Sequence, residues 1–300
     1  MINRSSVKYY LKKILPKPLF KAILVVWQSI FLRFVEVIDR WRLRNFTSYR
    51  AVALTHRGTT FSLYISPKNG FIDNYIYLYG VYEPFMLDLM SIHLKEGMTF
   101  VDIGANIGEH SMYAASIVRE TGSVHAFEPI PAIHKQLGDS VKENHFENII
   151  YANNIALGEY DLEQKLHVSK NIGGSSLVHD DDTQETITVQ VKNGDRELAS
   201  LDAIDMIKID VEGYEYEVLH GIKNTLLKHT PILLLEFSGE AYKKGGRGHG
   251  AKILSLLREC NYLLFDIEDD MNTVTDDTRF DHLLSGSRKQ TNLLCVHKSL

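Results

Sequence analysis

The chain has 300 residues, of which 44% are apolar and 24% charged, and its formal net charge is −5. These values are typical of a globular protein and exclude a disordered or fibrous chain. The acidic balance argues against a nucleic-acid partner. The two cysteines, Cys260 and Cys295, lack the CxxC spacing of a zinc site, and without a disulfide framework they fit a reducing, cytoplasmic location.

Residues 1–50 are rich in basic and large apolar side chains, with almost no acid before Glu36. The charge-free core at 22–32 is much shorter than the roughly 20 residues that span a bilayer, and no signal-peptide cleavage site follows it. We predict a basic amphipathic helical arm. Packing on the protein or a partner is the favoured interpretation. Peripheral contact with the inner membrane surface is the alternative, which liposome flotation of the full chain would test.

Residues 51–82 alternate polar with branched or aromatic side chains, which predicts a β-rich extension, and residues 83–300 form the main domain. In that domain, short apolar runs alternate with helical patterns, which is typical of a mostly parallel sheet with helices on both faces. The last two runs lack a helix between them and predict an antiparallel pair. Residues 160–197 predict a β-hairpin insert. The strands are expected at 99–104, 123–128, 149–154, 206–211, 231–237, 262–267 and 293–298, and the helices at 108–118, 131–145, 213–229 and 250–260.

The segment FVDIGANIGEH (100–110) places a glycine-containing loop directly after the first strand of this domain. It reads D-x-G-x-x-x-G from Asp102 through Gly104 to Gly108, which does not fit the dinucleotide fingerprint G-x-G-x-x-G. Asp102 would repel a phosphate but suits an ammonium group. Glu128 ends the second run, where a carboxylate can accept both ribose hydroxyls. An amino group and a ribose without phosphate indicate S-adenosylmethionine. The simpler alternative is that both acids cap helices.

Several blocks of the chain resemble the FkbM family of S-adenosylmethionine-dependent methyltransferases. The resemblance implies a class I methyltransferase (Rossmann-like) fold and O-methylation of sugars in surface glycans or of natural-product hydroxyls. It covers the chain from about Phe61 onward, includes Glu83, and implies nothing about residues 1–50. The matching blocks are YGVYEP (79–84), FVDIGANIGEHS (100–111), VHAFEPIP (124–131), IALG (155–158), GGSSL (173–177), LDAIDMIKIDVEGYEYEVLHG (201–221) and PILLLEF (231–237).

The segment KIDVEG predicts the catalytic groups. Because side chains alternate along a strand, Lys208, Asp210 and Glu212 share one side, and Gly213 allows a sharp turn after them. Glu236 reaches the same edge from the next strand. Asp210 or Glu212 is the favoured general base for a sugar hydroxyl. The acids could also serve only to position the loop, while Mg²⁺ binding is possible but not favoured. Lys208 is expected to pair with the acids.

Each of the remaining candidate site residues also has a purely structural explanation. Asn106 suits the methionine carboxylate of the cofactor or a tight turn, and Asn154 suits the adenine edge or a turn. Glu83 is a cofactor-site candidate or a first-turn acid favoured by the helix dipole. Residues 171–177 suit an active-site lid or an ordinary hairpin loop. His110 is expected to be a surface or helix-start histidine, with a catalytic role as the alternative.

The sequence thus predicts an O-methyltransferase that uses S-adenosylmethionine and acts on a sugar hydroxyl of a surface glycan or glycolipid precursor. A polyketide-type hydroxyl is the alternative acceptor. From other classes, a NAD-dependent oxidoreductase is disfavoured by the missing third glycine. A non-catalytic scaffold is disfavoured because the acids at 102, 128, 210 and 212 are all present. The particular acceptor and the oligomeric state stay open.

Overall fold

The computed structural model describes residues 38–67, 69–169, 183–238, 249–268, 271–274 and 290–300. The chain forms two compact units, Met1–Thr47 and Ser48–Leu300. In the first unit residues 38–44 are helical, and the predicted arm core at 22–32 lies outside the described residues. Among the described residues, no helix combines the length and the apolar character that crossing a membrane requires. The assignment of the arm, the extension and the main domain as separate domains stays a prediction.

The second unit is built on an eight-stranded sheet in the order β12-β11-β13-β10-β9-β3-β4-β5. Strands β10, β9, β3, β4 and β5 are parallel, while β13 runs antiparallel between β10 and β11. The predicted parallel sheet and its antiparallel closing pair are therefore confirmed. The bounds are β3 (Thr99–Ile103), β4 (Ser123–Phe127), β5 (Ile150–Asn153), β9 (Met206–Ile209), β10 (Ile232–Ser238), β11 (Tyr262–Asp266), β12 (Asn272–Thr273) and β13 (Gln290–His297).

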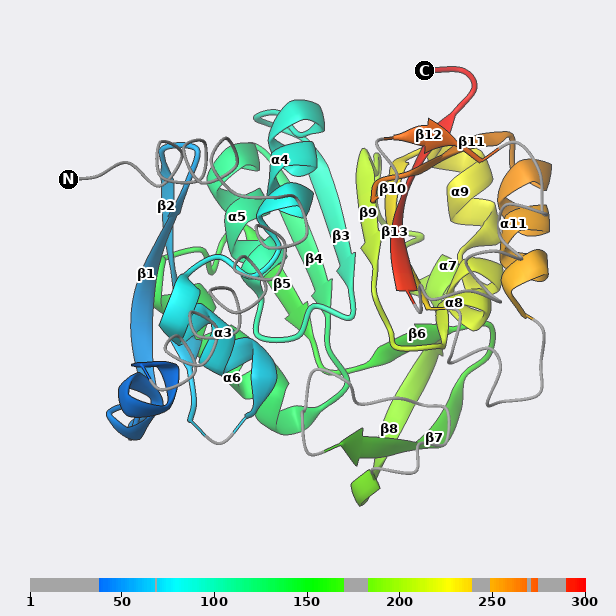
Figure 1. Ribbon diagram of the computed structural model, residues 1–300. Helices are drawn as coiled ribbons and strands as arrows, with labels where there is room; N and C mark the ends of the chain where they lie inside the picture. The colour runs from blue at the N-terminus through cyan, green and yellow to red at the C-terminus, as the bar shows by residue number, and fades with distance from the viewer. Residues whose placement is uncertain (1–37, 68, 170–182, 239–248, 269–270, 275–289) are drawn as a thin grey trace, which may run out of the picture. The chain divides into compact units, whose positions relative to one another are not determined.

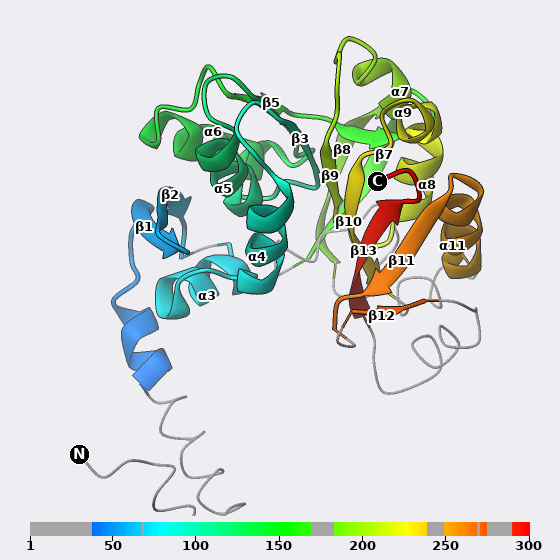
Figure 2. The ribbon, with the colours of Figure 1, turned by 90° about the horizontal axis from the view of Figure 1, so that it is seen from above.

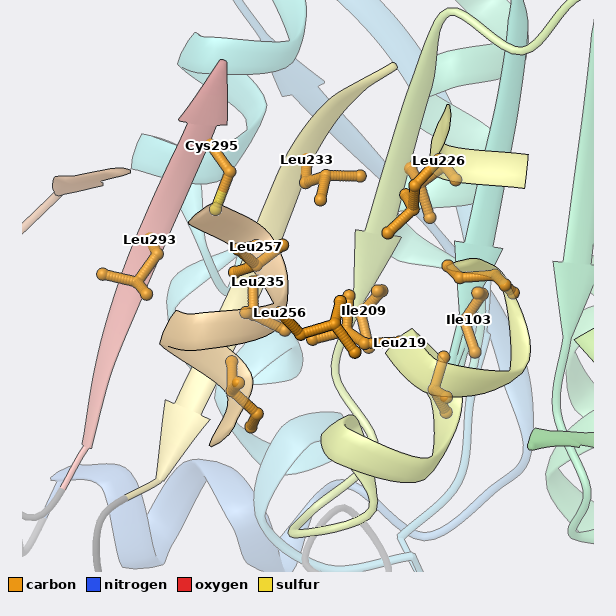
Figure 3. Packing of buried hydrophobic residues seen from close by; sticks show 14 of the residues in the cluster. Ile103, Ile209, Leu219, Leu226, Leu233, Leu235, Leu256, Leu257, Leu293 and Cys295 are labelled. Carbon is orange, nitrogen blue, oxygen red and sulfur yellow. The ribbon is translucent and has the colours of Figure 1, made fainter. Parts of the chain in front are cut away.

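Helices cover both faces of this sheet, as predicted (Figures 1 and 2). One face carries α4 (Pro84–His93), α5 (Glu109–Val118) and α6 (Pro131–Glu143). The other carries α8 (Glu215–Gly221), α9 (Lys223–His229) and α11 (His249–Glu259). Alternate strand residues such as Ile103, Ile209 and Leu235 pack there against helical leucines such as Leu219 and Leu257 (Figure 3). Because the strand period is two, the intervening residues, among them those at 102 and 208, face the α4–α6 side.

Residues 50–79 fold onto the α4–α6 side of the unit. Strands β1 (Arg50–His56) and β2 (Thr59–Ile65) pair antiparallel, as the alternating pattern predicts. The strand-like texture predicted for the next segment is wrong, because Phe71–Tyr79 forms helix α3. Asp73 and Ile76, three residues apart, are both buried on one side of this helix. Tertiary contacts thus decide the conformation over the β propensity of its tyrosines and isoleucines.

The predicted hairpin insert forms a second, smaller sheet. Strands β7 (Leu162–Ser169) and β8 (Thr183–Asn193) pair antiparallel, and β6 (Ala156–Gly158) runs parallel to β8. The short helix α7 (Gly194–Glu197) follows. The proposed lid at 171–177 lies outside the described residues.

The loops after β3 and β9 touch at Gly104. This residue has a φ of +80°, and an added Cβ would lie 1.8 Å from the carbonyl oxygen of Asp210. A side chain is therefore excluded by both the backbone conformation and the neighbouring chain. The contact fixes the spacing between the glycine loop and the segment that carries Asp210.

We predict that Gly104→Ala destabilises the protein by more than about 2 kcal/mol, since the Asp210 backbone must move to admit the methyl group. Urea unfolding measures the change. Gly138→Ala, at a position of α6 where an added Cβ meets nothing within 4 Å, is the matched control and should stabilise by roughly 0.5–1 kcal/mol. Equal effects of the two substitutions would contradict the close approach of the loops.

Candidate active site

A buried lysine joins the carboxyl ends of the two central strands. Lys208 of β9 lies in register with Asp102 of β3, and its Nζ is 3.8 Å from Asp102 Oδ1 and 3.1 Å from Asp210 Oδ2. Burial alone would lower the pKa of Lys208, but the charges of Asp210 and Asp102 outweigh burial and raise it above its usual value. Lys208 is therefore a permanent cation that pairs with the acids, as expected from its place in the strand.

Asp102 is fully buried, and both of its oxygens face protein groups. Ser111, in the first turns of α5, donates a hydrogen bond of 2.6 Å to Oδ2, while Oδ1 faces Lys208 without a hydrogen bond. Burial raises the pKa of Asp102, and the Lys208 charge opposes that rise. In this arrangement Asp102 orients Lys208, and its predicted contact with a ligand ammonium group stays a prediction.

The structure brings together the three acids at 210, 212 and 236, whose carboxylate oxygens lie within 4.8 Å of one another. Glu212 has a left-handed φ of +51°, and Gly213 next to it has a φ of +99°, so the predicted sharp turn forms at this point. Such a conformation is costly for a glutamate and is typical of functional sites. The same three oxygens would also suit a hard cation such as Mg²⁺.

Asp210 and Glu236 differ in protonation. Burial tends to raise the pKa of Asp210, but the adjacent Lys208 charge holds it below its ordinary value. Glu236 is 6% exposed, and its Oε2 has no hydrogen-bond partner. Burial, and then the Asp210 charge, raise the pKa of Glu236 well above its ordinary value. The pair therefore holds one proton on Glu236 and a negative charge on Asp210.

Glu128 links the loop after β3 to the chain after β4. Its Oε2 accepts the backbone N–H of Asn106 at 3.0 Å, and its Oε1 accepts that of Ile130 at 2.8 Å. Burial raises its pKa to about 7, although both amides oppose the rise. Each oxygen keeps a second lone pair that can accept a hydroxyl. Asn106 itself has a φ of +51°, and its side chain accepts the Ile107 N–H at 2.8 Å, as a turn residue does.

Asn154 stabilises the same region from the end of β5. Its side-chain amide donates to the carbonyl oxygens of Glu128 and Pro129, at 2.9 and 3.0 Å. This contact fixes the chain after β4, which neither of the two roles expected for Asn154 describes. Its contact with adenine stays a prediction.

His110 lies at the start of α5, as one of the two expectations has it, but it is buried and not on the surface. It is 6% exposed, and the residue that precedes α4, Glu83, lies against it. Glu83, the N-cap residue of α4, places its Oε2 3.4 Å from His110 Nε2. Burial, then the Lys208 charge, lower the pKa of His110 to about 3. Burial, then the Asp210 charge, raise that of Glu83 to about 7. The histidine is therefore neutral at pH 7, and this contact is not an ion pair.

Two further residues of this region were not predicted from the sequence. Glu109 is 5% exposed, and its Oε1 accepts the backbone N–H of Tyr82 at 2.8 Å. Tyr82 itself lies close enough to the carboxyl cluster that those charges help to raise its phenol pKa, after burial. Glu109 lies at the start of a predicted helix and Tyr82 at the end of the predicted β-rich extension, so only their tertiary position reveals them.

The order of the strands reverses at β3: the chain continues to β4 and β5 on one side of it and then to β9 and β10 on the other. An antiparallel strand, β13, lies near one edge. This arrangement defines a class I, Rossmann-like methyltransferase fold. The acids cluster at the carboxyl ends of the strands, where ligands bind in open α/β sheets. The predicted fold class is confirmed.

The family model described as "Methyltransferase FkbM domain" matches residues 102–264. The chain therefore belongs to the FkbM methyltransferase family, whose cofactor is S-adenosylmethionine, and the predicted family is confirmed. Among curated proteins, it is 27% identical over 149 residues to the hexuronic acid methyltransferase AglP of Haloferax volcanii, an alignment that covers 48% of this chain and 58% of that relative.

Two solved structures are similar at lower identity. Methyltransferase FkbM from Methylobacillus flagellatus aligns at 16% identity with a TM-score of 0.43, over 74% of this chain and 52% of the other. Aeropyrum pernix fibrillarin, with natively bound S-adenosyl-L-methionine, aligns at 11% identity with a TM-score of 0.38, over 83% of this chain and 100% of the other. Because these scores are low, the family assignment rests on the sequence match.

The residues present fit S-adenosylmethionine better than a dinucleotide. Asp102 retains a buried oxygen without a hydrogen-bond partner, and Glu128 retains acceptor capacity next to the loop. The surrounding carboxyl groups favour a cationic ligand and oppose a pyrophosphate.

A pH-dependent stability test follows from Glu109, whose pKa burial raises to about 7. The pKa of this carboxyl is about 4.5 in the unfolded chain and about 7 in the folded protein. Between these two pH values the unfolded state binds fewer protons than the folded state, so the contribution of this group to stability falls as the pH rises. We expect the unfolding free energy of Glu109→Gln relative to the unsubstituted protein to increase by on the order of 2–3 kcal/mol between pH 4.5 and pH 8. Urea unfolding without cofactor measures it. The exposed Glu143→Gln is the control, and a pH-independent difference for Glu109→Gln would contradict the assignment.

Proposed function

We propose that the protein transfers a methyl group from S-adenosylmethionine to a sugar hydroxyl of a glycan or glycolipid precursor. The observation that carries this proposal is the Asp210–Glu236 pair, held by buried Lys208 at the ligand-binding edge of the sheet. The similarity to a hexuronic acid methyltransferase supports a carbohydrate acceptor. The chain spans 58% of the length of that relative, so the carbohydrate acceptor is part of the proposal.

The cofactor supplies, when bound, a methyl group on a positively charged sulfur. Glu128 would hold the ribose hydroxyls with the lone pairs left by its two amide contacts. Asn106 would hold the methionine end of the cofactor. Gly104 and Gly108, which both have a positive φ, would let this loop turn tightly around the ligand. Glu83 and Asp102 contribute negative charge that favours a cation.

Asp210 serves as the general base in this proposal. Its pKa is held low by Lys208, so the carboxylate is ionised at neutral pH and accepts a hydroxyl proton as the nucleophile attacks. It is 27% exposed at its side chain, which leaves it accessible to an acceptor. Glu236 carries the shared proton and holds Asp210 in place, and Glu212 extends the acidic edge.

Two alternatives use the same geometry. The three carboxylates at 210, 212 and 236 would bind Mg²⁺, which would itself activate a hydroxyl. A polyketide-type hydroxyl would equally find a base at Asp210. A cytoplasmic location, with the arm at the inner membrane surface, is part of the glycolipid proposal and stays a prediction.

We predict that Asp210→Asn lowers methyl transfer by roughly 10²- to 10⁴-fold, the usual contribution of a general base. The assay measures labelled methyl transfer from S-adenosylmethionine to a glycolipid and polysaccharide extract of the source cells. The affinity for S-adenosylhomocysteine should change little, because the proposed ribose contacts lie at Glu128. Exposed Asp202→Asn is the matched control.

An unchanged rate in Asp210→Asn would overturn the base assignment. A rate that EDTA abolishes and Mg²⁺ restores would instead favour the metal alternative.

A further inference from the structure

An aromatic cluster lies on helix α3 and the connection that follows it. It consists of Phe71, Tyr75 and Tyr79 on α3 and of Tyr82 before α4. Tyr82 meets Phe71 and Tyr75 edge to face, with ring centroids 5.9 and 5.3 Å apart, and Tyr75 lies 5.0 Å from Tyr79. The spacing of four residues along α3 places its three aromatic rings on one side of the helix.

The opposite side of α3 holds the helix against the core. Asp73, 2% exposed, accepts hydrogen bonds from the Ser66 backbone N–H and from the Gln136 side chain on α6, at 2.5 and 2.8 Å. Ile76 is buried next to it. The aromatic side is thereby turned outward, where Phe71 remains 54% exposed. The orientation of the cluster is therefore fixed by buried contacts, which makes it a rigid surface.

The cluster continues into the candidate active site through Tyr82. The backbone N–H of Tyr82 is bonded to Glu109 at the start of α5, directly after the glycine loop. The next residue, Glu83, contacts His110 of the same helix. One edge of the aromatic surface therefore borders the carboxyl groups of Glu83 and Glu109. Burial, then the charges of Glu83 and of the carboxyl cluster beyond it, raise the pKa of the Tyr82 phenol, which agrees with this position.

Such an edge has the composition of a sugar-binding site. A pyranose ring has an apolar face of C–H groups, which suits the negative face of an aromatic ring, while its hydroxyls need a few convergent polar groups. Here the aromatic face and the carboxyl groups are adjacent. A surface patch of exposed aromatic side chains with polar groups at its border is also the usual mark of a binding site.

We propose that the aromatic cluster is the acceptor subsite, on which the apolar face of a pyranose ring stacks so that one hydroxyl reaches Asp210. This inference rests on the proposed function and specifies the residues that select its substrate class. Phe71 and Tyr75 contact the ring, and Tyr82 lies between the ring and the acids. None of these aromatic residues takes part in the proton transfer.

Saturation-transfer difference NMR tests the proposal with a defined probe, an equimolar mixture of the methyl pyranosides of glucose, galactose, mannose and rhamnose. We expect saturation of ring C–H protons with the full chain. Phe71→Ala should weaken it roughly two- to tenfold, the affinity equivalent of one aromatic contact. Tyr151→Ala, which removes an aromatic ring 51% exposed on edge strand β5, is the matched control and should leave the signal unchanged.

Circular dichroism and S-adenosylhomocysteine titration of the same samples separate the possible failures. Equal sugar signals from Phe71→Ala and the unsubstituted protein, or no sugar signal from folded protein that binds S-adenosylhomocysteine, would overturn the acceptor subsite alone. Loss of S-adenosylhomocysteine binding by the folded, unsubstituted protein would overturn the proposed function as well.

Discussion

The site depends on one buried cation, Lys208, held between the carboxylate of Asp102 on β3 and that of Asp210 directly after β9. Asp102 and Asp210 lie 3.8 and 3.1 Å from its amino group, and Lys208 is 3% exposed. Removing one partner of a buried ion pair typically costs on the order of 3–5 kcal/mol, because the other charge is left uncompensated. This triad therefore fixes the relation between the glycine loop after β3 and the acidic segment after β9.

The protonation of the site follows from the same cation. Lys208 keeps Asp210 ionised, and the negative charge on Asp210 in turn keeps the proton on Glu236. Two carboxyl groups in nearly the same place thus take opposite states, which is how acid and base roles are commonly divided in enzymes. Around them, the half-buried carboxyl of Glu83 and the buried carboxyls of Glu109 and Glu128 have pKa values raised to about 7. An edge of this kind is stabilised by a cationic ligand.

Sequence reasoning reached the sheet because buried parallel strands give short apolar runs bounded by polar turns, and those at 100–103 and 206–209 are broken only by Asp102 and Lys208. It also reached the convergence of Asp210, Glu212 and Glu236, since neighbouring parallel strands end at one edge. The period-two alternation of strand side chains predicted that Lys208 and Asp210 share a side, and their contact agrees.

What sequence reasoning missed depends on contacts between distant segments. His110 has the sequence context of an exposed helix start, and only the chain around Glu83 buries it. The aromatic residues of α3 favour a strand by propensity, yet the hydrogen bonds of Asp73 and the burial of Ile76 make the segment helical. The position of Asn154 after β5 placed it near the cofactor loop. Its hydrogen bonds to two backbone carbonyls could not be predicted from that position. Propensity and spacing carry no information on such pairings.

The central claim is that the edge organised by Lys208 binds S-adenosylmethionine through the loop that Glu128 holds. Its most direct test is calorimetric titration of the full chain with S-adenosylhomocysteine, beside Glu128→Gln and the exposed Glu143→Gln. The account predicts saturable one-to-one binding by the unsubstituted protein and by Glu143→Gln, and loss of binding in folded Glu128→Gln. Absence of binding by the folded, unsubstituted protein, or equal binding by all three proteins, would contradict it.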